Sequence, residues 1–376
     1  MSALRQKIEQ EIREHGPIPF SRYMEVCLYD PELGYYSRNA AQFGKAGDFY
    51  TSSDVHAVFG RLLARQFEEM WRALGSPEHI TVKELGPGRG LFAQDVLEWS
   101  EEKFPDFFRA LRYVLEERSP ALRQRIEVTL DRHLRSGRAA LMSGNDAGTP
   151  NIVFANEFFD ALPVQVLSSA GSLSIDFRDG RLVETWAPAA DEELEFLDRY
   201  SIHPQTGERV EVPLQSQTHM RAAANIECGF VVTVDYGYTR DEQLAGRHRG
   251  TVKAIRQHSV SSNPYEAPGE QDITADVNFT ALAAVAEQQG MKAQKLVTQS
   301  QFLLGIGEAN EFADAFEECR LPQERAKVAL QLKHLVTPAG MGESFHVLVA
   351  SKGVECESVT RLAGLSFGMR AIGKRT

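Results

Sequence analysis

The chain has 376 residues, of which 43% are hydrophobic and 25% are charged, so it is long enough for one large α/β core and a smaller second unit. Its formal net charge of −11 argues against a general nucleic-acid binder. No run of apolar residues approaches the roughly 20 that a membrane-spanning helix needs, so we expect no membrane span.

The first residues and the cysteines predict a cytoplasmic protein. The N-terminus lacks the apolar core of a signal peptide, and its glutamates are unlike a mitochondrial presequence. The four cysteines lie far apart without CxxC spacing, which is typical of reduced thiols. The ten histidines form no HxxxH or HExxH pair, so we expect no metal site.

Helical periodicity dominates the first part of the chain. It predicts helices at residues 3–14, 20–29 and 55–71, and the first of them is stopped by Gly16-Pro17. Loop-like sequence fills the space between the second and third helices. We therefore expect residues 1–75 to form a helical N-terminal arm that precedes the first strand of the core.

After residue 76, candidate strands alternate with helices. Strands are predicted at 80–85, 111–116, 139–142, 151–156, 230–235 and 345–351, with helices at 91–100 and 121–134. This alternation predicts an α/β fold with a mostly parallel sheet. The β-branched run at 230–235 suits a strand that is buried on both faces.

Residues 166–225 interrupt the alternation. Two strand-like runs around Asp179-Gly180 predict a β-hairpin, and residues 209–212 predict an edge strand. We interpret 166–225 as a small β-rich insertion and a candidate substrate element. The core then consists of residues 76–165 and 226–352, and residues 353–376 form a C-terminal tail.

A glycine turn follows the first core strand. Gly86, Gly88 and Gly90 let the backbone turn sharply and approach a ligand, and a helical pattern begins at Leu91. Strand, turn and helix together describe the first βα unit of a nucleotide-binding sheet, although a purely structural loop is an alternative. Glu84 before a GxGxG spacing is the pattern of enzymes that use S-adenosylmethionine. Dinucleotide enzymes instead use GxGxxG with a helix N-terminus aimed at a pyrophosphate.

The next two strands end in polar residues. Glu117 is placed to accept hydrogen bonds from both ribose hydroxyls of an adenosine, and it lies further beyond the apolar run than Glu116 does. A charged helix-capping cluster is the alternative. Asp146, in Ser143-Gly144-Asn145-Asp146, is a candidate for contacts with the adenine edge, with a plain turn as the equal alternative.

The segment Asn156-Glu157-Phe158-Phe159-Asp160 follows a buried strand, at the edge where open α/β sheets bind ligands. Two carboxylates beside two aromatic rings suit a guanidinium group, which takes bidentate hydrogen bonds and stacks on rings. Glu157 and Asp160 are therefore the candidate catalytic residues, since they would position one nitrogen and assist the departure of its proton. The alternative is a helix cap with core aromatics.

Two later stretches also stand out. Asp235-Tyr236-Gly237-Tyr238 is expected to follow the strand at 230–235, at the ligand edge of the sheet. Residues 268–279 are expected to form a polar loop that leads into a helix, with Thr274 or Asp276 as its cap. Either stretch is also compatible with ordinary loop chemistry.

Together these motifs resemble one family of class I S-adenosylmethionine-dependent methyltransferases. Its eukaryotic members are mitochondrial complex I assembly factors that symmetrically dimethylate arginine. The resemblance runs from about residue 17 to 351. It rests on Gly34-Tyr35-Tyr36, Gly47-Asp48-Phe49, Thr51-Ser52, Glu84 to Gly90, Glu157 to Asp160 with Leu162-Pro163, Asp235-Tyr236-Gly237, and Asp272 to Val277.

The resemblance implies a Rossmann-like class I fold and a set of cofactor contacts. Gly86, Gly88, Gly90 and Glu117 would contact S-adenosylmethionine, with Gly47, Asp48, Phe49 and Thr51 closing over it from the N-terminal arm. Glu157 and Asp160 would face the acceptor. Asn156 departs from the histidine of eukaryotic relatives, and the lack of a presequence fits a bacterial member.

The sequence thus predicts a protein-arginine N-methyltransferase with a protein substrate, of which a respiratory-complex subunit is one candidate. One alternative is a methyltransferase-fold assembly factor that acts by binding such a subunit. A small-molecule methyltransferase is another, and a nicotinamide oxidoreductase is a weaker fourth. A homodimer is left open.

Overall fold

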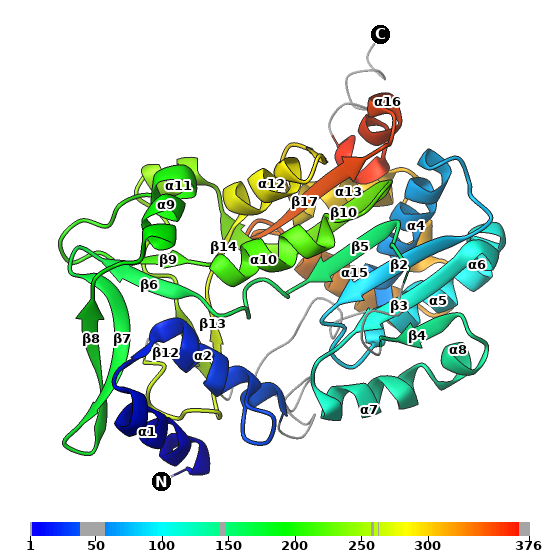
Figure 1. The fold of residues 1–376 in the computed structure, drawn as a ribbon. Helices are drawn as coiled ribbons and strands as arrows, with labels where there is room; N and C mark the ends of the chain where they lie inside the picture. The colour runs from blue at the N-terminus through cyan, green and yellow to red at the C-terminus, as the bar shows by residue number, and fades with distance from the viewer. Residues whose placement is uncertain (1, 38–56, 143–147, 257–258, 262, 368–376) are drawn as a thin grey trace.

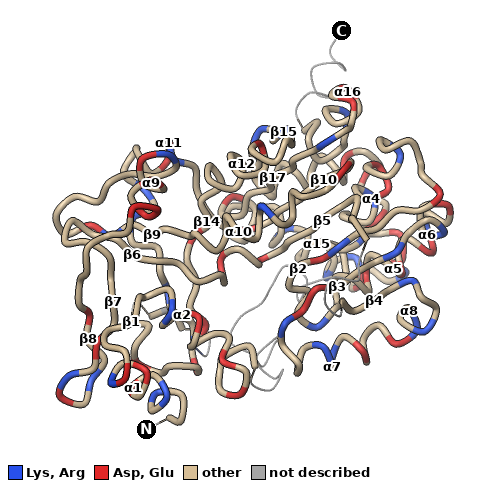
Figure 2. The backbone as a smooth tube through the Cα atoms, in the orientation of Figure 1, with Lys and Arg blue, Asp and Glu red and all other residues tan. Residues whose placement is uncertain are grey.

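The computed structural model describes residues 2–37, 57–142, 148–256, 259–261 and 263–367, which form two lobes (Figure 1). One lobe is built on a nine-stranded sheet and the other on a five-stranded sheet with a three-stranded one beside it. Lysine and arginine are interspersed with aspartate and glutamate over both lobes (Figure 2). No helix in these ranges is long and apolar enough to cross a membrane.

The nine-stranded sheet is mostly parallel, as predicted. Its strand order is β15-β17-β10-β5-β2-β3-β4, and the strands from β10 to β4 run parallel while β17 is antiparallel to β10. The strands are β2 (Ile80–Leu85), β3 (Leu111–Glu116), β4 (Ala139–Leu141), β5 (Ile152–Asn156), β10 (Gly229–Tyr238), β14 (Val277–Asn278), β15 (Lys292–Ala293), β16 (Val297–Thr298) and β17 (Phe345–Lys352). The carboxyl ends of five neighbouring parallel strands therefore meet at one edge.

Helices cover both faces of this sheet. Phe154 of β5 packs with α4 (Ala57–Ala73), α5 (Leu91–Lys103) and α13 (Gln299–Glu308), whereas its neighbours Val153 and Ala155 pack with α10 (Leu214–Ala223) and α12 (Phe279–Gln288). Adjacent residues of a strand point to opposite faces, which explains the division. The remaining helices of this lobe are α6 (Pro105–Ala110), α7 (Pro120–Thr129), α8 (Asp131–Arg135), α14 (Ala313–Phe316), α15 (Pro322–Val336), α16 (Cys356–Thr360) and η3 (Ala363–Leu365).

The second lobe joins the N-terminal arm to the segment after β5. Its antiparallel sheet contains β1 (Ile18–Pro19), β6 (Gln165–Ser168), β7 (Gly171–Arg178), β8 (Arg181–Ala187) and β9 (Val210–Val212). Helices α1 (Ala3–His15) and α2 (Phe20–Tyr29) share an apolar cluster with β7, and β1 pairs with β7. Also present are η1 (Tyr35–Ser37), α9 (Asp191–Tyr200), α11 (Arg240–Leu244), β11 (Lys253–Arg256), β12 (Ser259–Ser261) and β13 (Asp272–Thr274). The predicted hairpin around Asp179-Gly180 is confirmed as β7 and β8.

Three expectations about local structure are wrong. Tyr236, Gly237 and Tyr238 lie within β10 and not after it, because β17 and β14 supply strand partners there. The single helix predicted at 121–134 is two helices that break at Leu130. The cap of α12 is Asn278, whose side chain accepts from the Ala281 N–H.

The aromatic cluster behind β5 offers a test of this packing. Phe154 is fully buried, stacks on Phe92 with ring centroids 4.5 Å apart and meets Phe67 edge-on. Phe154→Ala leaves a cavity in the centre of the sheet, so we expect the free energy of unfolding in urea to fall by about 3–5 kcal/mol. Val128→Ala, at a side chain that is 79% exposed, should change it by less than about 0.5 kcal/mol. Equal effects of the two substitutions would contradict this packing.

Candidate active site

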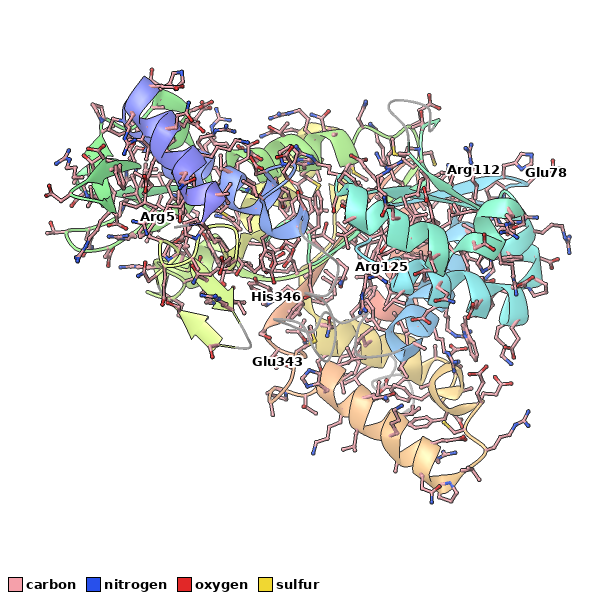
Figure 3. The ribbon with its side chains drawn as sticks, turned by 90° about the horizontal axis from the view of Figure 1, so that it is seen from below. Arg5, Glu78, Arg112, Arg125, Glu343 and His346 are labelled. Atoms are coloured by element: carbon pink, nitrogen blue, oxygen red, sulfur yellow. The ribbon has the colours of Figure 1, made fainter. Side chains whose placement is uncertain are left out.

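A cavity of about 1260 Å³ opens at the carboxyl edge of the parallel strands and is lined by residues from both lobes. Most ligand pockets measure roughly 300–1,000 Å³, so this one has room for two ligands. His346 and Glu343 line this cavity. In the view from below, they lie between Arg5 at one end of the molecule and Glu78 at the other (Figure 3). The cavity brings together six residues singled out from the sequence: Glu84, Gly86, Gly88, Glu117, Glu157 and Asp160.

The glycine turn adopts a backbone that requires glycine. Gly86, Gly88 and Gly90 have φ angles of 61°, 56° and 77°, in the left-handed region. A Cβ on Gly86 would lie 2.8 Å from the Phe158 ring, so the turn packs directly against the segment after β5. Open space surrounds the Cβ position of Gly88. Gly90 is not among the described residues that line the cavity; its Cβ position meets Ile126 of α7.

Glu84 is a buried carboxyl at the base of the cavity. It accepts a hydrogen bond of 2.9 Å from the Tyr113 hydroxyl of the neighbouring strand β3. Burial raises its pKa to about 8, against the lowering effect of that hydrogen bond. The side chain is therefore protonated at neutral pH in the free protein.

Glu117 and its neighbour Glu116 both line the cavity but have different surroundings. Glu116 is paired with Lys83 at 2.5 Å and its side chain is 41% exposed. Glu117 accepts from the Ser119 N–H at 2.8 Å, and burial raises its pKa to about 7. The Ser119 hydroxyl in turn donates to the Tyr36 carbonyl of the N-terminal arm. Glu117 is thus the more enclosed of the two carboxyl groups.

The segment Glu157 to Asp160 is held in place by Asp235. One carboxylate oxygen of Asp235 accepts from the N–H groups of Phe158, Phe159 and Asp160 at 3.0–3.3 Å, and the other accepts from its neighbour Tyr236. Burial and the neighbouring carboxylates raise the pKa of Asp235, whereas these four N–H groups favour its ionised form. Glu157 has a φ of 49°, an uncommon conformation for a residue with a side chain. The backbone segment that carries the two candidate carboxylates is therefore held by Asp235.

Asp160 has an incomplete set of hydrogen bonds. Its Oδ2 accepts from the Tyr236 hydroxyl at 2.6 Å. Its Oδ1 is buried and has no hydrogen-bond partner in the described part of the chain. Burial raises the pKa of Asp160 to about 6, so it is mostly ionised at neutral pH. A buried carboxylate oxygen without a partner is costly, which indicates that a cationic or donor group completes the site.

Several cavity residues were not assigned roles from the sequence. The Tyr36 hydroxyl donates to Asp272, and the Tyr29 hydroxyl donates to the Ala161 carbonyl. His248 and Lys253 both bind Asp276, at 2.9 and 3.1 Å. Their positions depend on the pairing of the two lobes, which local sequence does not indicate.

Five candidate cofactor residues, Gly47, Asp48, Phe49, Thr51 and Asp146, lie outside the described residues. Within the described ranges, no group of three or more His, Cys, Asp or Glu side chains is arranged to hold a metal ion.

The raised pKa of Glu84 predicts a pH-dependent stability. Between about pH 4.5 and pH 8 the folded protein keeps a proton on Glu84 that the unfolded chain has lost, so the free energy of unfolding falls as the pH rises. Glu84→Gln removes this titration. We measure urea unfolding from pH 5 to pH 8. We expect the free energy of unfolding of the variant to fall less steeply with pH than that of the unmodified protein, by up to about 1.4 kcal/mol per pH unit.

Glu127→Gln, at an exposed position on α7, is the control and should keep the dependence of the unmodified protein. If Glu84→Gln and Glu127→Gln show the same pH dependence, Glu84 is not protonated in the folded state.

Comparison with known proteins identifies the fold and the cofactor. A family model of S-adenosyl-L-methionine-dependent methyltransferases matches residues 62–297. A crystal structure of a COG1565 superfamily member from Burkholderia thailandensis, bound to S-adenosyl-homocysteine, matches with a TM-score of 0.81 and 28% identity, over 96% of this chain and 95% of that chain.

Two curated relatives are also methyltransferases by name. The mitochondrial protein arginine methyltransferase NDUFAF7 homolog of Drosophila melanogaster is 30% identical, over 94% of this chain and 85% of its own length. The human mitochondrial protein arginine methyltransferase NDUFAF7 is 27% identical, over 89% of this chain and 80% of its own length. With a glycine turn, an enclosed Glu117 and a cavity at the carboxyl edge of a class I-type sheet, the chain belongs to this family of S-adenosyl-L-methionine-dependent methyltransferases.

Proposed function

We propose that the chain transfers the methyl group of S-adenosyl-L-methionine to an arginine side chain of a protein. The Oδ1 of Asp160, which has no hydrogen-bond partner among the described residues, carries the proposal, because a guanidinium N–H is the donor that a buried anion lacks. Relatives named as protein arginine methyltransferases support the same acceptor. By resemblance to the assembly factors, a subunit of a respiratory complex is the protein substrate we propose.

The residues that would hold the cofactor line the cavity. Gly86 and Gly88 present backbone without side chains, and Glu117 offers a carboxylate for the ribose hydroxyls. S-adenosyl-L-methionine supplies an electrophilic methyl carbon on a sulfonium and leaves as a neutral thioether. The Phe158 ring lies against Gly86, so cofactor and acceptor segments share a wall.

The acceptor end is acidic and aromatic. Glu157 and Asp160 face the cavity beside Phe158 and Tyr236. Two carboxylates localise the positive charge of the guanidinium and direct one nitrogen, while the rings contact its planar face. Since Asp235 fixes this segment, the nitrogen would be aligned for attack without further ordering of the protein.

The two adjacent glutamates provide a matched test of the cofactor site. Glu117→Gln removes the charge that accepts the ribose hydroxyls, so we expect the affinity for S-adenosyl-homocysteine to fall by about 10- to 100-fold in calorimetry. Glu116→Gln should weaken binding far less, because Glu116 is already paired with Lys83. A larger effect at Glu116 would reverse the assignment.

Substitution of the acceptor carboxylates should separate catalysis from cofactor binding. We expect Glu157→Gln and Asp160→Asn each to slow methyl transfer by at least about 100-fold, since the guanidinium loses an oriented charged partner. The affinity for S-adenosyl-homocysteine should stay within about 3-fold of that of the unmodified protein, which corresponds to a change in binding free energy of less than roughly 0.7 kcal/mol. Glu227→Gln, at an exposed residue, is the control. Full activity of both acceptor variants would exclude these roles.

The assay that identifies the acceptor uses labelled S-adenosyl-L-methionine and a proteome extract from a strain that lacks the gene. The proposal predicts label in protein and recovery of methylarginine after acid hydrolysis. Label confined to small molecules, or to another side chain, would reject arginine as the acceptor. If Glu157→Gln stops labelling while the cellular function persists, binding of a partner is the main role of the protein.

A further inference from the structure

We propose that His248 accepts the proton released when the acceptor nitrogen is methylated, and that Asp276 positions the His248 ring. This inference rests on the proposed function, because it concerns the acceptor half of the same cavity. His248 lies in the loop that follows α11, and Asp276 lies between β13 and β14. Both residues line the cavity that contains Glu157 and Asp160.

The His248 ring is held by contacts on two sides. Its Nδ1 is 2.9 Å from Oδ2 of Asp276. The ring stacks on Tyr238 with centroids 5.1 Å apart and an angle of 18° between the planes. The backbone of His248 has a φ of 53°, and strained residues of this kind cluster at functional sites. The surroundings thus fix the orientation of the imidazole.

The hydrogen bond to Asp276 determines which ring nitrogen is basic. A carboxylate accepts, so Nδ1 carries the proton in the neutral ring and Nε2 carries the lone pair. Across the residues that the structure describes, Nε2 has no hydrogen-bond partner. An oriented imidazole with a free basic nitrogen, in a cavity wall, is the arrangement of a general base.

Asp276 binds both Lys253 and His248. Its Oδ1 accepts from Lys253 at 3.1 Å, and its own N–H donates to the Thr251 hydroxyl. The charge of Asp276 is therefore already balanced by Lys253 when His248 is neutral. The carboxylate is then placed to stabilise the imidazolium that forms when His248 takes up a proton.

The His248 pair is connected to the acceptor carboxylates across the cavity. The negative charge of Asp276 contributes to the raised pKa of Asp160, after the larger effect of burial. Lys253 lies 5.8 Å from the centre of the Tyr236 ring, whose hydroxyl donates to Asp160. Asp160 and Glu157 hold the guanidinium, and we assign removal of the proton to His248.

The step balances as follows. The guanidinium nitrogen forms a bond to the methyl carbon, the carbon–sulfur bond breaks, and its electron pair stays on sulfur to give S-adenosyl-homocysteine. The methylated guanidinium would carry two positive charges, so the attacking nitrogen must lose one proton. That proton passes to Nε2 of His248, and the imidazolium later releases it to water.

Other titratable and charged groups surround His248. They come from several elements: Asp276 and Lys253, His346 on β17, Tyr238 on β10, Glu242 on α11, and Arg247 and Arg249 on either side in the chain. Arg247 is paired with Glu242, and Arg249 with Glu208. Burial first, and the charge of His248 in addition, lower the pKa of His346. His346 is thus a neutral neighbour at physiological pH.

The test compares two histidine–aspartate pairs in the full chain. His203, bonded to Asp198 at 2.7 Å, is exposed and does not belong to the described lining of the cavity, so His203→Gln is the matched control for His248→Gln. The probe is the initial rate of methylarginine formation in the deletion-strain extract, at saturating S-adenosyl-L-methionine, from pH 6 to pH 9. Calorimetry with S-adenosyl-homocysteine and thermal melting give readouts that are independent of activity.

We expect His248→Gln to lower the rate by at least about 100-fold across this pH range. Asp276→Asn should lower the rate less than His248→Gln does, because the ring keeps its basic nitrogen and loses only the carboxylate that orients it. His203→Gln should leave rate and pH profile unchanged. Affinity for S-adenosyl-homocysteine and the melting temperature should be unaffected by His248→Gln.

The outcomes distinguish this inference from the function on which it rests. If the unmodified protein forms no methylarginine, the proposed function fails and this inference falls with it. If it does, and His248→Gln retains the rate and pH profile of His203→Gln, only the role of His248 is wrong. Loss of S-adenosyl-homocysteine affinity or of the melting transition in His248→Gln would equally reject a role confined to proton transfer.

Discussion

The hydrogen bonds from the backbone to the Asp235 carboxylate are the constraint on which the rest of the site depends. Asp235 is fully buried within β10, and it accepts the N–H groups of the segment that follows the neighbouring strand β5. This arrangement turns the chain sharply after Asn156 and directs Glu157 and Asp160 into the cavity. An apolar residue at 235 would leave the N–H groups of Phe158, Phe159 and Asp160 without their acceptor.

The second constraint is the junction of the two lobes. The N-terminal arm contributes Tyr29 and Tyr36, whose hydroxyls bind Ala161 and Asp272. The hydroxyl of Ser119, after β3, binds the carbonyl of Tyr36 and thereby connects the ends of the cavity. Because these bonds are made between segments far apart in sequence, the cavity exists only when both lobes are folded. Cofactor and acceptor segments are consequently organised by one network.

The sequence predicts the core of the fold well and the acceptor wall only in part. Strands β2 and β3 and helix α2 match their predicted bounds, because period-two alternation and helical periodicity are local signals. The glycine turn was predictable, since three residues with positive φ leave a spacing that can be read directly. Tyr236, Gly237 and Tyr238 were placed beyond the strand, because their partners on β17 and β14 are distant in sequence.

The pairing of His248 with Asp276 could not be read from local sequence. The two residues are 28 positions apart, in loops without periodicity, and only the packing of β11 against β13 brings them together. Similarly, the burial of Asp160 and its single hydrogen-bonded oxygen depend on Tyr236 from another strand. The sequence pattern predicts which residue types lie at the edge of a sheet. Tertiary contacts decide which of those residues pair with one another.

The central claim is that one cavity holds the cofactor and an arginine side chain together. The most direct measurement is a crystal structure of the protein with S-adenosyl-homocysteine and an arginine-containing peptide. The account predicts the ribose at Glu117 and the guanidinium within hydrogen-bond distance of Oδ1 of Asp160. A guanidinium bound elsewhere, or an Asp160 oxygen completed by water alone beside a bound peptide, would contradict it.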